Sequence, residues 1–595
     1  MRKGFALVSV LILLAVLMSF LTAYFFLTLT EIRTTSSSAR QTTGFYAAEA
    51  GLNLRAEEIR QKFLGYNRPQ GTSPQSNAPC QGTNQGSGDF ACKTYTISGR
   101  TVRTYVREAE GNPHNITIPP GELYEYLEAQ EYRYHLYSEA VGPDGRTEAL
   151  LELVFKSRLV PMFQFAAFYN KDLEILPGPN MTLNGRVHTN KDLYLSSGNT
   201  LTIMGQVSTA GKLYRGRKDT NSCGGTVNIQ RQAGDLAPLA CGSGGTRKSY
   251  TQSEVAGWGG RIQVGVDPVT VPEPEELDPT PGKTYWDKAD LRIGLDLSGP
   301  TPSVKAYRVS SGQTLVDPVS TATLFVCNAV GYTLGDFHNN REGKDIKMLE
   351  VDLGKVLDCI HNNRTAFGFA LDDDTEGGLV FFLTVFGPNS SGINDYGVRV
   401  KGGASLISTV SGAPKPRGLT LVSDQAVYIQ GDFNRDGPAW IPAAVLADSI
   451  NILSNAWSRD TLSREPLSRR QASNTEVNAA FLAGTDTTGN QEGEGGRDRG
   501  AYNGGLENYP RFHEDWSGKT LTYRGSFVSL GKPRKVNGPW CGTGTGCGTA
   551  GRGIYNPPIR QWSFDSRFAQ GQLPPLSPRF VYLRQERFLR EFERR

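Results

Sequence analysis

Seven cations between residues 211 and 250 form the densest group of side chains in this sequence that could bind a ligand. Two anions, Asp219 and Asp235, oppose them. Such a segment can bind a phosphate backbone, because each neutralised phosphate releases condensed counterions. The segment predicts neither a recognition helix nor a zinc finger, so any contact with duplex DNA should be independent of base sequence. The cations are Lys212, Arg215, Arg217, Lys218, Arg231, Arg247 and Lys248.

An acidic segment at residues 267–290 offers a second interpretation of the basic one. It carries seven carboxylates against two cations, Lys283 and Lys288. The basic segment could then be a solvated loop whose charge the acidic segment balances. The net charge of the chain is only +4, so the total charge does not decide between the two interpretations.

Two acidic motifs are further candidates for chemistry, and each has a simpler explanation. Asp432 to Gly437 read D-x-N-x-D-G, with Asp436 in the fifth position, as at the start of a calcium-binding loop. The twelfth position is Ala443 instead of glutamate, so we expect a corner stabilised by Asx turns. Residues 372–374 are three aspartates that could supply paired carboxylates for glycoside cleavage, but an acidic loop explains them as well.

No motif in the sequence indicates a catalytic centre. We find no nucleophile elbow, no phosphate-binding glycine loop and no metal triad. We therefore expect a protein that is not an enzyme and that binds no metal and no cofactor.

The C-terminal residues 579–595 interleave arginines with aromatic side chains. Arginine and aromatic residues together can bind a strand of nucleic acid. An amphipathic helix that packs its aromatic face on the protein is the interpretation that we favour.

The eight cysteines fall into four local pairs, which predict four disulfides in an exported domain. Zinc is not expected, because the sequence contains no C-x-x-C and no histidine at ligand spacing from a cysteine pair. Local loops close at modest entropic cost, so these bonds would stabilise the glycine-rich insertions. The pairs are Cys80 and Cys92, Cys223 and Cys241, Cys327 and Cys359, and Cys541 and Cys547.

A long helix is expected at the N-terminus. Residues 5–29 are an unbroken apolar segment without charge or proline, and they follow Arg2, Lys3 and Gly4. Twenty-five residues make about 37 Å of helix, enough to span a bilayer. Apolar residues continue at helical spacing to Phe63, so one helix over residues 5–65 should leave the membrane and continue outside it.

Strands are expected after this helix. Residues 93–108 and 132–158 alternate polar and apolar side chains, and Gly-Pro-Asp-Gly at residues 142–145 is a turn signal. We expect an antiparallel head sheet over residues 66–160, with a polar loop at residues 66–92. The 595 residues exceed one compact core, and 68 glycines with 33 prolines favour many turns and short strands.

A repeat of 20 residues follows the predicted head. Asn170-Lys171-Asp172-Leu173 recurs as Asn190-Lys191-Asp192-Leu193, and Leu213-Tyr214 begins a third copy. This spacing predicts the rungs of a β-solenoid over residues 161–457, although two hairpins of equal length could produce two such copies. Residues 458–507 are expected to be a polar loop region, and residues 508–595 a distal β region with the C-terminal segment. The fold class is thus α+β, mostly β.

The first 65 residues resemble the type IV pilins and pseudopilins. Phe45-Tyr46-Ala47-Ala48-Glu49-Ala50-Gly51 is similar to the signature of the PilX-like minor pilins. The resemblance implies that residues 1–4 are a prepilin leader, removed after Gly4 by a prepilin peptidase that then methylates Phe5. Most pilins carry glutamate at the fifth mature position, where this chain has Ser9, which argues against a major filament subunit. An ordinary signal peptide or a plain one-span anchor is the alternative.

The expected order of helix, head and inserted solenoid is similar to that of competence minor pilins that bind double-stranded DNA. This resemblance implies a tip-located minor pilin that takes up DNA in natural transformation. Its partners would be other pilins, the prepilin peptidase and duplex DNA. It would lie in the inner membrane as a precursor and then on the cell surface in the pilus. The alternatives are a minor pilin for pilus assembly, surface adhesion or glycan binding, and, third, an anchored carbohydrate-active enzyme.

Overall fold

The computed structural model describes residues 3–64, 69–485, 505–537 and 551–591. The chain divides into two compact units. The head unit comprises Met1–Ile116, Ala129–Leu159 and Val581–Arg595. The solenoid unit comprises Thr117–Glu128 and Val160–Phe580.

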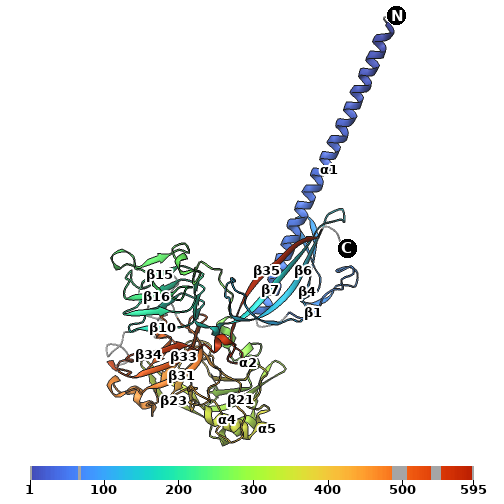
Figure 1. Cartoon of the computed structure of the whole chain (residues 1–595). Coiled ribbons are helices and arrows are strands. Elements are labelled where there is room, and N and C mark those ends of the chain that lie inside the picture. Colours follow the sequence, from blue (N-terminus) through green and yellow to red (C-terminus); the bar gives the residue numbers. More distant parts are fainter. Residues whose placement is uncertain (1–2, 65–68, 486–504, 538–550, 592–595) are drawn as a thin grey trace. The chain divides into compact units, whose positions relative to one another are not determined.

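One helix, α1 (Lys3–Leu64), forms the N-terminal part of the head unit (Figure 1). Its apolar half contains an 18-residue window with a mean hydropathy of 2.6, and no part of that window is buried. Length and composition therefore allow this half to cross a membrane. The prediction of one continuous helix that runs beyond the apolar segment is confirmed.

The second half of α1 packs on the head sheet. Ala47, Ala48, Leu52 and Ile59 are buried in one cluster with side chains of the strands. Gly51 lets the helix approach, because a Cβ built on it would lie 2.6 Å from Val102 Cγ1. The small residues of the F-Y-A-A-E-A-G motif therefore form the contact face of the helix.

The head sheet is antiparallel where the sequence predicts a meander. Its strand order is β3-β4-β6-β7-β35, with β5 paired to β6. A turn at residues 142–145 joins β6 to β7, and the Gly145 N–H donates to the Gly142 carbonyl at 3.0 Å. The strands are β3 (Lys93–Ile97), β4 (Arg100–Glu108), β5 (His114–Thr117), β6 (Glu128–Val141), β7 (Thr147–Pro161) and β35 (Arg579–Glu591). A short pair, β1 (Gly71–Thr72) and β2 (Ser87–Gly88), lies in the preceding loop.

The C-terminal segment is a strand, so the prediction of an amphipathic helix is wrong. Strand β35 lies next to β7 at one end of the head sheet. Phe588 contacts Phe45 with ring centroids 6.0 Å apart, and the Tyr582 hydroxyl accepts from Arg158 at 2.8 Å. The aromatic residues pack on the protein as expected. The element is a strand because β7 offers an edge with free backbone groups.

The first arm of the solenoid unit, residues 165–264, stacks rungs with a period of 20 residues. Leu193 lies opposite both Leu173 and Leu213 in parallel register, and all three side chains are fully buried. One face contains β8 (Phe165–Tyr169), β11 (Arg186–Thr189), β14 (Val207–Thr209) and β19 (Ile262–Val264). The second contains β9 (Leu173–Ile175), β12 (Leu193–Leu195), β15 (Leu213–Arg215) and β18 (Lys248–Tyr250), and the third β10 (Met181–Leu183), β13 (Thr200–Ile203), β16 (Thr226–Gln230) and β17 (Leu236–Pro238). The predicted β-solenoid is confirmed.

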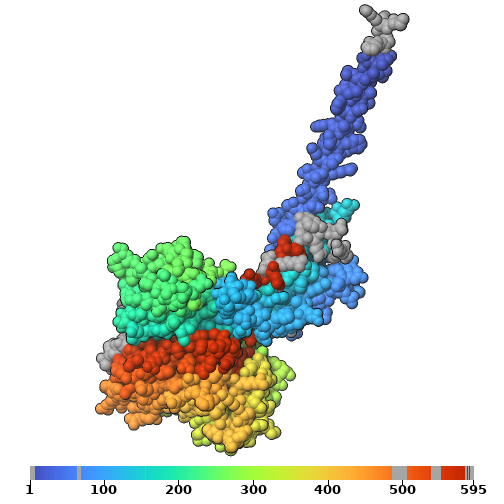
Figure 2. All heavy atoms as spheres, in the orientation of Figure 1, coloured from blue at the N-terminus to red at the C-terminus, as the bar shows by residue number. Residues whose placement is uncertain are grey.

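The second arm, residues 291–564, stacks further parallel rungs back toward the first. One face runs β20 (Leu291–Asp296), β25 (Leu379–Phe386), β27 (Leu419–Val422), β29 (Ala443–Ala447), β31 (Thr475–Ala483) and β33 (Thr520–Ser529). Another runs β24 (Lys344–Asp352), β26 (Tyr396–Lys401), β28 (Ala426–Gln430), β30 (Ser449–Leu453) and β32 (Pro510–Phe512). Strand β33 pairs with β8, and β34 (Ile559–Phe564) pairs with β33, so the two arms share one sheet. In Figure 2 the red band, the colour of the residues in β33 and β34, lies between the green and orange surfaces.

The predicted polar loop at residues 458–507 requires a correction. Strand β31 lies inside that range and pairs with β29 and β33 in the middle of the sheet. The apolar run from Ala479 to Ala483 is buried, and the polar residues on both sides of it make it hard to recognise in the sequence. Residues 486–504 lie outside the described part of the chain.

A small cap covers the far end of the second arm. It contains β21 (Ser303–Ser310), β22 (Gln313–Asp317), β23 (Val330–Asn339), α3 (Pro318–Val326), α4 (Leu353–Asn362) and α5 (Arg364–Phe367), while α2 (Thr284–Lys288) precedes β20. Three predicted disulfides are confirmed, Cys80–Cys92, Cys223–Cys241 and Cys327–Cys359. The predicted pair of Cys541 and Cys547 lies outside the described residues.

Candidate functional site

Polar side chains form ladders at one corner of the first arm, and they explain why the N-K-D-L motif repeats. The Asn190 amide donates to Asn170 Oδ1 at 2.9 Å. The Asp192 N–H donates to Asp172 at 3.1 Å, and the Lys212 N–H donates to Asp192 at 2.8 Å. Each rung thus satisfies polar groups of the next one, as buried backbone requires. The motif therefore serves the stacking of the rungs.

Two cations of the basic segment are buried. Arg215 is 1% exposed and donates to four backbone carbonyl groups at 2.7 to 3.3 Å. Lys218 is 2% exposed, and its Nζ lies 2.8 Å from Asp172 Oδ2. Neither side chain can reach a phosphate backbone, so their prediction as DNA contacts is wrong. The physical reason is that both neutralise or satisfy buried groups of the arm.

Two further cations hold the loop in place. Arg217 binds Asp219 through two hydrogen bonds of 2.8 and 2.9 Å. The Arg247 guanidinium lies 5.7 and 5.2 Å from the ring centroids of Tyr194 and Tyr214, which stack 4.7 Å apart. Cation–π contacts of this kind attract the loop to the solenoid face. The 20-residue repeat already indicates this tyrosine stack, because the two tyrosines are 20 positions apart.

Three cations of the segment remain at the surface. Lys212 is exposed. Arg231 and Lys248 are 45% and 37% exposed and pair with Asp235 and Glu254 at 3.4 and 3.3 Å. Exposed pairs contribute little, about 0–1 kcal/mol each, so a phosphate can replace the carboxylate partner. The surface that could meet a nucleic acid is therefore smaller than the sequence predicts.

The acidic segment pairs with other cations of the solenoid unit. Arg534 binds Asp278 at 2.7 Å and approaches Glu275 at 3.7 Å, and Lys283 binds Glu276 at 3.3 Å. These carboxylates therefore pair with cations of the second arm and of the acidic segment itself. Local pairing thus accounts for part of the acidic charge.

The motif at residues 432–437 is a corner of the second arm. Asp432 Oδ1 accepts from the Asn455 amide at 2.8 Å and from the Glu476 N–H at 2.9 Å. Asp436 pairs with Arg524 at 2.6 Å and with Arg567 at 3.0 Å. The protein's own donors and cations therefore occupy the carboxylates that a calcium loop would offer.

The three aspartates at residues 372–374 lie in a turn before β25. Asp373 accepts from the Thr375 N–H at 2.9 Å, and Asp374 pairs with Arg417 at 2.9 Å. The contacts match the simpler explanation of an acidic loop.

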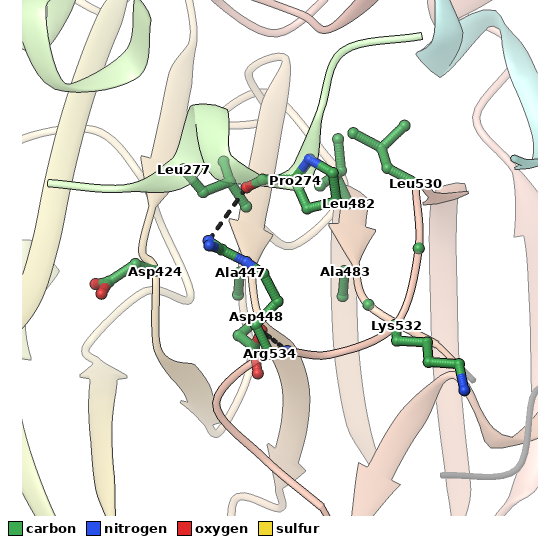
Figure 3. Close-up of a pocket in the computed structure, with 12 residues that line it drawn as sticks. Pro274, Leu277, Asp424, Ala447, Asp448, Leu482, Ala483, Leu530, Lys532 and Arg534 are labelled. Carbon is green, nitrogen blue, oxygen red and sulfur yellow. Dashed lines mark hydrogen bonds between the residues drawn. The ribbon is translucent and has the colours of Figure 1, made fainter. Parts of the chain in front are cut away.

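A small cavity lies where the acidic segment meets the second arm (Figure 3). Asp448 accepts from the N–H groups of Lys535 and Val536 at 2.9 and 3.1 Å, and the Arg534 side chain donates to the Pro274 carbonyl at 3.2 Å. Burial raises the pKa of the Asp448 carboxyl. The cavity measures about 20 Å³, which suffices for about one water molecule. This polar cluster therefore joins segments of the fold.

Comparison with known proteins gives one structural likeness. No protein-family model matches the chain, and no curated protein matches it. Among solved structures, it is similar to the competence-associated pilin ComZ from Thermus thermophilus. The two are 13% identical, the match covers 92% of this chain and 98% of that one, and the TM-score is 0.24. A score this low carries no inference, so the function must be argued from the residues.

Proposed function

We propose that this protein is a non-catalytic minor pilin of a type IV pilus that presents its β-solenoid for binding. Helix α1 carries the proposal. Its first half exposes large apolar side chains such as Leu7, Phe20 and Phe26, each at least 65% exposed, while one face of its second half is buried on the head sheet. An apolar surface of this size requires lipid or other subunits around it. A helix that anchors in the membrane and then packs in a filament meets that requirement.

The start of the mature chain tests this proposal. We expect the N-terminal peptide of the protein from a pilus preparation to begin at Phe5 and to be methylated, as mass spectrometry would show. A Gly4→Val variant should remain uncleaved, whereas a Ser9→Ala variant should still begin at Phe5. A wild-type chain that begins at Met1 or near Ala23 would reject the pilin proposal.

A position at or near the tip is part of the proposal. Ser9 supports it, because the resemblance places a glutamate at this position in the major filament subunits. Immunogold labelling should decorate the ends of the filaments. Uniform labelling along the shaft would reject a tip position and leave the pilin assignment intact.

Duplex DNA, bound for uptake in natural transformation, is the proposed ligand of the solenoid. Residues 161–266 carry eleven cations against six anions, which supports this choice. Of the predicted contacts, Lys212, Arg231 and Lys248 stay in the proposal, because they lie at the surface.

Salt dependence tests the DNA contact. Replacing Lys212, Arg231 and Lys248 together by Ala should weaken binding to all duplex sequences alike. It should flatten the slope of log affinity against log salt by about 0.9 per lost phosphate contact. A matched control removes three exposed cations of the second arm, Lys355, Arg417 and Arg435, and should keep the slope. An equal change in both variants would reject this surface as the DNA site.

A further inference from the structure

A cavity on the outer face of the first arm begins where a covering loop ends. The outward positions of β8, β11, β14 and β19 align as Phe168, His188, Ser208 and Gln263. Thr117–Glu128 is the covering loop, and its Tyr124 ring lies 5.8 Å from the His188 ring. His188 is fully buried, and its Nδ1 lies 2.8 Å from the Ser208 hydroxyl. The cover therefore closes over one half of this face and leaves the half around Gln263 open.

The open half forms a cavity of about 500 Å³ within the solenoid unit. This volume falls in the range of about 300–1,000 Å³ that small-molecule sites have. Tyr126 lines the cavity from the covering loop, Gln206, Arg261 and Gln263 from the rungs, and Gln232 from the hairpin after β16. The wall thus combines amide side chains, an aromatic ring and charged side chains of both signs.

Gln263 has an unused hydrogen-bonding group at this site. Its Oε1 is buried, and among the described residues no donor binds it. Neighbouring Gln206 is by contrast engaged, because it accepts from Arg186 and donates to the Gly260 carbonyl at 3.4 Å. Buried polar groups in proteins are almost always paired, and a turn of the Gln263 side chain toward the cavity that it lines would give this oxygen a partner there.

Tyr126 is held at the rim in an unusual backbone conformation. Its side chain is 58% exposed, and its φ of 65° lies in the left-handed region that bulky residues rarely adopt. Tyr124 is buried with a φ of 66°, and the Tyr126 N–H donates to the Ile118 carbonyl at 2.8 Å. Such strained residues concentrate at binding sites, where the surrounding structure maintains them. The loop thus presents an aromatic face to the solvent beside the cavity.

The charges that line the cavity balance. Arg186 and Arg261 line it together with Glu122 and Glu125, so the site does not select a phosphate or a polyanion. Each amide side chain both donates and accepts hydrogen bonds, which matches hydroxyl groups that do the same. We propose that the cavity binds a neutral saccharide, with a sugar ring against Tyr126 and hydroxyls bonded to Gln232, Arg261 and Gln263. The inference concerns the solenoid unit alone and does not depend on the pilin or DNA proposals.

Binding of defined trisaccharides tests the inference. The full chain is solubilised in a detergent without a sugar headgroup, and calorimetry measures cellotriose, maltotriose, mannotriose and chitotriose at millimolar concentration. We expect at least one of them to bind. Gln263→Met should weaken that binding by roughly tenfold, the equivalent of one lost hydrogen bond. Its unfolding temperature should stay unchanged, because no described protein group binds the Gln263 Oε1.

Substitutions of Tyr126 distinguish the contribution of its ring to binding from the contributions of its hydroxyl and of its backbone conformation. Tyr126→Asn removes the ring but tolerates the positive φ, so it should abolish binding in a folded protein. Tyr126→Phe should bind as the wild type does. Tyr332→Asn, which removes a 40% exposed tyrosine of β23, is the matched control and should also bind normally. Failure of all four sugars to bind, binding that survives Tyr126→Asn, or a Tyr126-dependent site for heparin or duplex DNA instead would overturn the proposal.

Discussion

Substituting the two buried cations of the basic segment should lower the stability of the fold, whereas substituting the exposed cations should weaken DNA binding. In Lys218→Ala, the Asp172 carboxylate loses an ammonium partner 2.8 Å away, in a site where the two side chains are 2% and 4% exposed. Removing one partner of a buried pair costs about 3–5 kcal/mol, because the other charge stays buried without its counter-ion. Lys212→Ala removes a cation of the same segment that is exposed, and should cost almost nothing.

Native-state proteolysis measures this difference. Rungs of a solenoid contact only their neighbours, so the loss should stay local and open residues 211–250 without unfolding the second arm. A change of 3 kcal/mol raises the open population by roughly a hundredfold. Thermolysin, which does not depend on lysine or arginine, should therefore cleave Lys218→Ala in this segment about a hundred times faster than the wild type or Lys212→Ala.

A double variant identifies the cause. Asp172→Asn with Lys218→Met removes both charges at once, and should recover much of the protection because no unpaired charge remains. If Lys218→Ala resists thermolysin as the wild type does and yet binds DNA more weakly, the division between folding and binding is refuted. Lys218 would then be a phosphate contact after all.

Three further changes test the head, the cap and the buried carboxyls. Gly51→Val should detach the second half of α1 from the head sheet, since even a Cβ there lies 2.6 Å from Val102. Faster hydrogen exchange in residues 45–59 would show the detachment, and Leu54→Ala, at an exposed position, is the control. Replacing Cys327 and Cys359 by Ala opens a 32-residue loop and should lower the stability of the cap by about 3–4 kcal/mol, seen as a lower denaturant midpoint. Burial raises the pKa of Glu514 to about 7, above an unfolded value near 4, so its contribution to stability is complete below about pH 4 and is lost as the pH rises to 7. Unfolding titrations of Glu514→Gln between pH 5 and 7.5 should show a flatter decline than the wild type.

Local patterns predicted the parts of the fold that repeat or that span a long uniform segment. Helix α1 follows from apolar spacing, and the first arm follows from the 20-residue register. The join of the arms could not be predicted, because Phe527 of β33 lies opposite Ala167 of β8, 360 positions earlier, and no period connects them. Strand β35 was missed for a related reason, since the free edge of β7 decides its conformation.

The candidate site likewise depends on contacts between distant parts of the chain, which local patterns do not predict. Sequence reveals that Arg215 and Lys218 are cations, but the groups that bury them lie far along the chain, such as Asp172, 46 positions before Lys218. The saccharide cavity was not predicted at all. It brings Tyr126 together with Gln263 from the last rung, and neither residue belongs to a motif.

An insertion in the third rung links these observations. Val207 lies 20 positions after its partner Val187, whereas Ile262 lies 55 positions after its partner Val207. The extra residues supply the loop over Tyr194 and Tyr214 and also the wall of the cavity at Gln232. Because β19 keeps its register with β14, the solenoid could stack with a shorter connection. The insertion also supplies part of the buried core, including Leu239, Tyr250 and Trp258, so its exposed loop and the cavity wall rest on packed residues of the arm. A role in binding explains the part of the insertion that lies outside that core.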